Sequence, residues 1–554
     1  MSDPTVLDPA QRSAALAAAS AEEHDVVVIG AGATGTGAAL DAAARGLSVV
    51  LVEAGDIASG TSSRSGKTFH GGLRYLEQLN FGLVNSALHE RNLMVNRLCP
   101  FLATPEPFLY PLTKHWERPY IGAGIALYDA MTLTTKGVPH HHHFTHKGVL
   151  REAPALDPDL VVGGIRYHDV RIDDARHTMM LARTAAGLGA HVISRARVVE
   201  VLRSGDRVAG VVIEDGNTGV RHRIRARVVI SAAGVWSARI QEMAGQQTFR
   251  IQPAKGVHVV LPKSALDSRT GLFARAEDSV IIIRKWGDYW MLGTTDTPYT
   301  GDLAAPRAED HEIEYLLRNI NRYLRTKISR DQIVGTFAGL RPLLAPLSDD
   351  PDATSALARD HSVIPGPDGL ITIVGGKYTT YRAMAADAVD AAAAQLGRPV
   401  PASLSEELPV VGTDGWRAVL NRADALGREF GVPAEQVRRL VGRYGALTPE
   451  VLRPALADPA WGRPVEGAPG FLAAEYRYAV THEGASTLAD VLWRRTHVSF
   501  ETPDGGYEAA AGVAGLIGPQ LGWDAGEQAR QVSEYRDWIR SERAAIQEPA
   551  PSRS

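Results

Sequence analysis

The clearest pattern of hydrophobic and polar positions in the 554-residue chain lies near its N-terminus, at residues 25–53. Residues 26–29 form a short β-branched run, which is typical of a strand buried on both faces. An alanine-rich stretch with good helix propensity follows as far as Arg45, and a second apolar run occupies residues 47–52. This order predicts a strand–helix–strand unit.

Glycines at the first turn of this unit indicate its chemistry. Gly30, Gly32 and Gly35 form G-x-G-x-x-G between the strand and the helix, and Glu53 ends the second strand. The first glycine permits a tight turn, the second lets a pyrophosphate approach the backbone, and the third lets the helix pack close to the strand. The helix N-terminus favours phosphates, and a carboxylate at Glu53 can accept hydrogen bonds from ribose hydroxyls. Dinucleotide binding is therefore favoured over a purely structural glycine turn.

The rest of the chain shows three further kinds of pattern. A helix and several buried strands return to the nucleotide fold, at 173–188, 191–202, 224–230 and 370–374. Strands without helical alternation predict a separate antiparallel sheet that covers the nucleotide fold, at 256–261, 280–284 and 289–293, with one helix at 309–324. Helical patterns alone follow Pro401 and predict an all-helical C-terminal domain, at 416–430, 434–444, 471–481, 488–495 and 525–543. The proline-rich residues 100–111 predict a break where the chain crosses into the second domain.

Two more turns carry small residues where a ligand could approach. Ala233 and Gly234 end a predicted strand and precede Trp236, and Gly375 and Gly376 open a predicted helix. A simple strand-to-helix turn is the alternative for each. Because both follow strands of the same predicted sheet as the first motif, the three turns favour one extended ligand.

Composition limits the possible partners and compartments. The formal net charge of −4 gives no general attraction to nucleic acid, and the single cysteine, Cys99, excludes an internal disulfide framework and fits a reducing compartment. No secretory signal and no run of spanning length is visible. The apolar stretch 120–133, flanked by Lys114, Arg118 and Lys136, is too short to span a bilayer. It is either a helix in the membrane interface or a partly buried helix.

A run of histidines at residues 140–143, with His146 nearby, raises the question of a metal. Consecutive histidines cannot share one helix face, and no carboxylate or cysteine set stands at ligand spacing. An exposed loop is favoured, and no metal is predicted.

Several longer motifs carry a family resemblance. The segments TSSRSGKTFHGGLRYLE, GTTDT, AGLRPL, RDH and GGKYTTYRAMA, together with the glycine unit, resemble the FAD-dependent glycerol-3-phosphate dehydrogenases. The resemblance runs from about Asp25 to the helices around Arg495.

The resemblance implies an α/β fold: a glutathione-reductase-type, Rossmann-like FAD-binding domain, an antiparallel-sheet substrate cap and an all-helical C-terminal domain. The corresponding ranges are 24–110 with 170–245 and 355–398 for the FAD domain, 111–169 with 246–354 for the cap, and 399–545 for the helices. A short helix or tail at 1–23 and a disordered tail at 546–554 complete the prediction.

The resemblance also implies site residues. The substrate is a small dianion, and its phosphate needs cationic donors, because arginine meets phosphate oxygens bidentately. The implied substrate residues are Arg74, Tyr75, Arg341, Arg359 and Lys377. The implied FAD residues are Gly30, Gly32, Gly35, Glu53, Thr61, Ser62, Ser63, Gly71, Gly72, Val198, Ala233, Gly234, Trp236, Gly375, Gly376, Lys377 and Thr379.

Catalysis requires removal of the hydroxyl proton while hydride leaves for the flavin. His70 is the first candidate for general base, because a histidine suits that task near neutral pH, although a neighbouring arginine or a water could share it. Lys377 could balance the charge of reduced flavin. His70, Arg341 and Lys377 are therefore the predicted catalytic residues.

The resemblance implies oxidation of sn-glycerol 3-phosphate to dihydroxyacetone phosphate, with electrons passed through FAD to membrane quinone in glycerol catabolism. The enzyme is expected in the cytoplasm, on the inner face of the plasma membrane. Its oligomeric state stays open, with a homodimer as one candidate. Two alternatives stay open. One is an oxidase that uses oxygen, although no extra inserted segment is visible, and the other is a non-catalytic flavoprotein.

Overall fold

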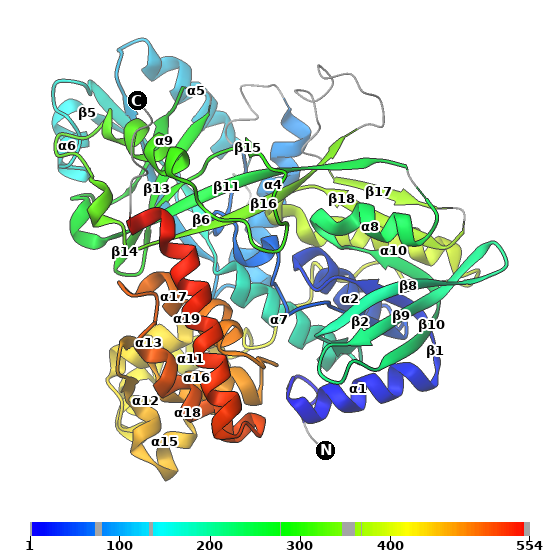
Figure 1. The fold of residues 1–554 in the computed structure, drawn as a ribbon. Helices are drawn as coiled ribbons and strands as arrows, with labels where there is room; N and C mark the ends of the chain where they lie inside the picture. Colours follow the sequence, from blue (N-terminus) through cyan, green and yellow to red (C-terminus); the bar gives the residue numbers. More distant parts are fainter. Residues whose placement is uncertain are drawn as a thin grey trace, which may run out of the picture.

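The computed structural model describes residues 3–72, 80–131, 137–246, 248–277, 279–345, 361–366 and 368–547. Figure 1 shows a sheet flanked by helices on the right, a second sheet towards the upper left, and a mostly helical part, yellow to red, at the lower left. Each sheet is assembled from segments far apart in the sequence, so the chain passes between the two sheets several times.

In the part of the chain that the structure describes, the first sheet has eight strands around a parallel centre. Strand β1 (Glu23–Ile29) pairs in parallel with β2 (Val49–Val52) and β10 (Arg221–Ser231). The parallel order continues outward to β7 (His191–Ile193) and β18 (Leu370–Gly375). Antiparallel strands are added at the sides: β17 (His361–Pro365), β8 (Ala196–Ser204) and β9 (Arg207–Asp215).

The unbroken apolar run of β1 is explained by burial on both faces. Val26 and Val28 join the hydrophobic core on the side of the helices, and Val27 and Ile29 join the core on the side of the β8–β9 hairpin. The helices on the first side are α2 (Ala33–Ala44), α7 (Asp174–Gly187) and α10 (Tyr381–Gln395), and α1 (Pro9–Ala21) and α8 (Ser237–Met243) pack on the second.

Among the described residues, the second sheet has ten strands and is antiparallel except for the pairing of β12 with β4. Its order is β15-β11-β14-β13-β12-β4-β6-β3, with β16 beside β11 and β5 beside β6. The strands are β3 (Thr68–Phe69), β4 (Thr104–Leu112), β5 (His142–Thr145), β6 (Gly163–Arg171), β11 (Arg250–Pro262), β12 (Gly271–Arg275), β13 (Val280–Trp286), β14 (Tyr289–Gly293), β15 (Thr297–Pro298) and β16 (Gly335–Ala345).

Helices pack against this sheet and lie between its strands. Helix α9 (Asp310–Asn321) packs its apolar stripe against one face, as the pattern at 309–324 predicts. Helices α4 (Phe81–Leu93), α5 (Glu117–Ala130) and α6 (His146–Glu152) lie in the segments between its first strands. The proline-rich stretch follows the end of the helical run at Leu98 and leads the chain into the second sheet, where β4 pairs with β6 along its whole length.

The C-terminal part is mostly helical, and it departs from the sequence prediction in several places. Residues 471–472 belong to a two-stranded hairpin, β19 (Pro464–Val465) and β20 (Ala468–Leu472), and residues 490–495 form a π-helix. The helices are α11 (Trp416–Asn421), α12 (Ala423–Phe430), α13 (Ala434–Tyr444), α14 (Thr448–Leu452), α15 (Pro454–Ala457), α16 (Ala473–Thr481), α17 (Val498–Glu501), α18 (Ala509–Leu521) and α19 (Ala525–Gln547). Figure 1 shows α19 running from this part towards the second sheet.

Within the described ranges, no helix has both the length and the apolarity that crossing a membrane requires.

Candidate active site

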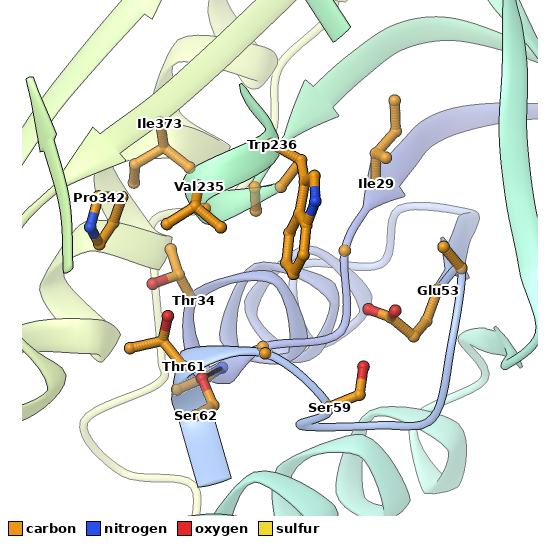
Figure 2. A pocket seen from close by; sticks show the side chains of 18 of the residues that line it. Ile29, Thr34, Glu53, Ser59, Thr61, Ser62, Val235, Trp236, Pro342 and Ile373 are labelled. Carbon is orange, nitrogen blue, oxygen red and sulfur yellow. Dashed lines mark hydrogen bonds between the residues drawn. The ribbon is translucent and has the colours of Figure 1, made fainter. Parts of the chain in front are cut away.

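A cavity of about 410 Å³ lies at the carboxyl ends of the parallel strands, the usual ligand position in an open α/β sheet. Figure 2 shows it around the turn between β1 and α2, with Glu53 and Ser59 on one side and Pro342 and Ile373 on the other. The three small-residue turns of the sequence all line it. It therefore joins residues from widely separated parts of the chain.

The first turn can accept only glycine at two positions. Gly30 has φ +103°, and a Cβ there would stand 2.7 Å from the carbonyl oxygen of Ala232. A Cβ on Gly35 would lie 1.8 Å from the carbonyl oxygen of Gly30, so Gly35 acts through helix packing and does not line the cavity. The backbone of Gly32 faces the cavity at the N-cap of α2.

Glu53 holds the turn and faces the cavity. Its Oε2 accepts a hydrogen bond from the backbone N–H of Ala31 at 2.8 Å, and its Oε1 accepts one from Gly55 at 2.8 Å. Burial raises the pKa of Glu53, and these two donors oppose that rise. The carboxylate therefore ties β2 to the glycine turn.

The other predicted cofactor residues fall into three groups. Most line the first cavity: Thr61, Ser62, Val198, Ala233, Gly234, Trp236, Gly375, Gly376 and Lys377. Gly72 and Thr379 line a second cavity instead. Ser63 and Gly71 are buried behind these walls, and a Cβ on Gly71 would overlap Leu88 and Tyr128. Ser59 also lines the first cavity, as do Thr34 and Arg239, which sequence reasoning did not single out.

The second cavity, of about 380 Å³, adjoins the first. Both are lined by Thr61, Pro342 and the turn at residues 375–378. His70, Arg341 and Lys377 line this second cavity, so the structure brings three predicted catalytic residues together. Arg74, Tyr75 and Arg359 lie outside the described residues.

Arg341 is a positioned cation on β16. Its Nη1 donates to Asp296 Oδ1 at 3.0 Å, and its Nη2 donates to the carbonyl oxygen of Thr295 at 3.2 Å. Its side chain remains 30% exposed, so the guanidinium is held in place and still accessible from the cavity. Lys377 follows two glycines with positive φ, which turn the chain between β18 and α10.

His70 follows β3, and its main chain is fixed by Thr379. The backbone N–H of His70 donates to Thr379 Oγ1 at 3.2 Å, and the hydroxyl lies 3.3 Å from the carbonyl oxygen of His70. The GGKYTT turn thus positions the HGG segment, which lies about 300 residues earlier in the sequence.

His258 on β11 is a candidate that sequence reasoning missed. It lines the second cavity, and its ring stacks on Phe337 at 4.8 Å between centroids. Burial holds the pKa of His258 well below its ordinary value, and the charges of Arg284 and Arg341 add to the effect. Its imidazole is therefore neutral near pH 7, and its buried surroundings, with cations nearby, disfavour the protonated form.

Arg284 on β13 also lines the second cavity and was also missed. Its Nη1 lies 3.6 Å from Glu106 Oε2, and both side chains are almost fully buried. The available signal was alternation along β13, where Val280, Ile282 and Arg284 share one face of the strand.

The histidine run is not simply an exposed loop, as the sequence suggested. Residues 142–145 form β5 and pair with β6, and His141 Nδ1 lies 2.7 Å from Asp129 Oδ2.

In the described part of the chain, one group has ligand atoms close enough for a metal: His89, Glu90 and Glu406. The carboxylate of Glu90 already accepts hydrogen bonds from Arg382 at 2.6–3.2 Å, so this group does not indicate a metal site.

Comparisons with known proteins identify the class. A family model described as FAD dependent oxidoreductase matches residues 25–382, and one described as the C-terminal domain of alpha-glycerophosphate oxidase matches residues 403–528. The protein is therefore an FAD-dependent oxidoreductase with an appended C-terminal domain.

Individual relatives narrow the class. The chain is 48% identical to glycerol-3-phosphate dehydrogenase 2 of Mycobacterium tuberculosis, over 97% of this chain and 91% of that protein, and 49% identical to glycerol-3-phosphate dehydrogenase of Mycobacterium leprae, over 97% and 92%. The solved glycerol-3-phosphate dehydrogenase from Bacillus halodurans, complexed with FAD, superposes with a TM-score of 0.80 at 28% identity, covering 99% of this chain and all of that one. The chain belongs to the FAD-dependent glycerol-3-phosphate dehydrogenase family, which confirms the predicted family, fold class and cofactor.

The residues of the first cavity fit this cofactor. Glycine leaves open the space next to the α2 N-terminus where a pyrophosphate needs to approach, and Glu53 stands at one end of the cavity. The other end adjoins the cavity with the cationic and imidazole groups.

Proposed function

We propose that the protein oxidises sn-glycerol 3-phosphate to dihydroxyacetone phosphate. The observation that carries this proposal is the second cavity, where Arg341 and Lys377 stand beside His70 and His258, next to the FAD cavity. A dianionic phosphate suits the two cations, and an alcohol proton suits a neutral imidazole. FAD, when bound, supplies the acceptor for the hydride.

The decisive test is the anaerobic absorbance spectrum of the purified holoprotein. Adding glycerol 3-phosphate should bleach the oxidised flavin, and plain glycerol at the same concentration should not. A flavin that keeps its oxidised spectrum with glycerol 3-phosphate would contradict the proposal and support the non-catalytic flavoprotein.

A quinone is the proposed electron acceptor, and the wall beyond His258 supports it. In the pairing register His258 lies opposite Gly293, Gly293 opposite Ile282, and Ile282 opposite Phe273. With strands about 4.8 Å apart, the row extends about 14 Å across the sheet, from the backbone of His258 to that of Phe273. Ile282 and Phe273, with the neighbouring Phe108, line the same cavity. An apolar ring fits this wall better than a three-carbon phosphate does.

Replacing Ile282 by aspartate should therefore slow reoxidation of reduced enzyme by a water-soluble quinone at least tenfold, because a charge disfavours an apolar ring there. Flavin reduction by substrate should change less than threefold. Anaerobic stopped-flow measures the two half-reactions separately, with ferricyanide as a control oxidant. Rapid reoxidation of the wild type by air with stoichiometric peroxide would favour the oxidase instead.

We also propose that the enzyme is cytoplasmic and lies on the inner face of the plasma membrane. The proposed contact with the membrane is α5. Ile121 and Ile125 lie on the inner face of this helix, because they are 7% and 0% exposed and pack against the second sheet. The outward side chains are Trp116, Tyr120 and Leu127, at 58%, 56% and 42% exposure. An aromatic and apolar stripe beside basic residues suits a lipid interface.

Aspartate at both Tyr120 and Leu127 should reduce co-sedimentation with anionic lipid vesicles at least fivefold, because two charges then face the acyl boundary. The matched control places aspartate at Leu188 and Leu456, two leucines that are 42% and 57% exposed on other surfaces. Equal loss in the control, or no loss in the test variant, would contradict the assignment to α5. A homodimer stays a prediction.

A further inference from the structure

Two turns at the Glu53 end of the FAD cavity have an unfavourable backbone. Ala58 has φ +63° and Arg195 has φ +52°, although neither is glycine. Left-handed conformations are sterically costly for such residues, so surrounding contacts must hold them. Both turns line the cavity, one through Gly55, Ser59 and Gly60, and the other through Ala196, Arg197 and Val198.

Backbone hydrogen bonds join these turns to each other and to Glu53. The N–H of Arg195 donates to the carbonyl oxygen of Gly55 at 2.8 Å, and the N–H of Ala196 donates to that of Glu53 at 2.7 Å. The N–H of Ala58 donates to the carbonyl oxygen of Ala31, beside the glycine turn, at 3.0 Å. A displacement of either turn would therefore also shift Glu53.

Side chains of the π-helix Asp490–Arg495, in the C-terminal part, form ion pairs with both turns. Arg494 Nε donates to Asp56 Oδ2 at 2.5 Å, while Arg495 donates from both Nη atoms to the same carboxylate, at 2.9 and 2.7 Å. Asp490 Oδ2 accepts from Arg195 Nη2 at 2.6 Å. The two loops of the cavity are thus tied to one short helix by side chains that are mostly buried.

The π conformation explains how two consecutive arginines reach one carboxylate. Successive side chains of an α-helix diverge by about 100°, and the wider π turn brings them closer in angle. Such turns are rare and often stand at functional sites. Arg495 is fixed further by donating to the carbonyl oxygen of Glu483, at 2.7 Å from Nη2.

The charges of Asp56 and Arg494 also affect the pKa of Glu53. Asp56 adds to the burial that raises the pKa of Glu53, whereas Arg494 lowers it. The arginine therefore supports the ionised carboxylate that faces the cavity.

We propose that Asp490, Arg494 and Arg495 are positioning residues for FAD, through which the C-terminal helical part holds the Glu53 end of the cofactor cavity in its binding shape. Binding is reciprocal, so FAD in turn stabilises the docking of the C-terminal part.

The test measures FAD binding itself and not turnover. Apoprotein carrying Arg494→Gln and Arg495→Gln should bind FAD at least tenfold more weakly, as measured by quenching of flavin fluorescence on titration. The matched control is Arg439→Gln, which breaks a buried arginine–glutamate pair with Glu475 inside the same part. It should lower the melting temperature and leave the Kd for FAD within twofold. If the double variant does not fold, Arg494→Gln alone, with Arg495 still on Asp56, should weaken FAD binding about threefold to tenfold.

Limited proteolysis adds a second readout. FAD should protect the C-terminal part of the wild-type protein from cleavage and protect the variant less. An unchanged Kd in the arginine variants, or an equal shift in Arg439→Gln, would overturn the proposal.

Discussion

His70→Ala is expected to slow flavin reduction by glycerol 3-phosphate about 100-fold to 10,000-fold, the usual contribution of a general base. Because the alanine variant keeps Arg341 and Lys377 beside the cavity, the affinity for substrate should fall much less. Anaerobic stopped-flow at varied substrate concentration separates the limiting rate from the apparent Kd.

His258→Ala is the comparison variant. Its imidazole lines the same cavity and stacks on Phe337, so loss of the ring also removes packing. If His258→Ala shows the large loss of limiting rate and His70→Ala reduces flavin at nearly the wild-type rate, the base is His258 and the assignment of His70 is wrong.

Arg341→Ala is expected to raise the KM for glycerol 3-phosphate about 30-fold to several hundred-fold while FAD stays bound. Removing one partner of a charge-assisted pair costs on the order of 2–4 kcal/mol. Arg341 stands in the second cavity, and Asp296 and Thr295 hold it in place, so its loss removes a cation already oriented towards the ligand. Arg341→Lys should rescue only in part, because a point charge lacks the two-pronged fork.

The control for Arg341 is the substrate itself. Wild type and variant are compared with glycerol 3-phosphate and with plain glycerol, which lacks the phosphate. If Arg341→Ala discriminates between the two as strongly as the wild type, Arg341 does not bind the phosphate.

Much of the nucleotide fold could be predicted from local sequence. A β-branched run, three glycines and an acid at a fixed distance describe a short unit whose parts contact one another directly, so the sequence spacing already implies its geometry. The turns at Gly234 and Gly376 could be found in the same way. The structure places all of them around one cavity.

Residues that act through long-range contacts could not be found in this way. His258 and Arg284 stand on strands whose register with their neighbours sets which side chains face the cavity, and that register depends on pairing across the whole sheet. The sequence pattern of residues 120–133 likewise did not show which face of the helix is buried and which is exposed. Packing against the second sheet buried Ile121 and left Tyr120 exposed.

The sequence by itself determined the dinucleotide-binding unit, the family and the residues of its motifs, because each depends on neighbours within a few tens of positions. The tertiary structure alone decided which side chains meet across the cavities and how the C-terminal part contributes. Arg495 reaches Asp56 across 439 positions of sequence, through a π turn that the sequence pattern read as an ordinary helix. Such contacts depend on the packing of whole domains, which no local pattern encodes.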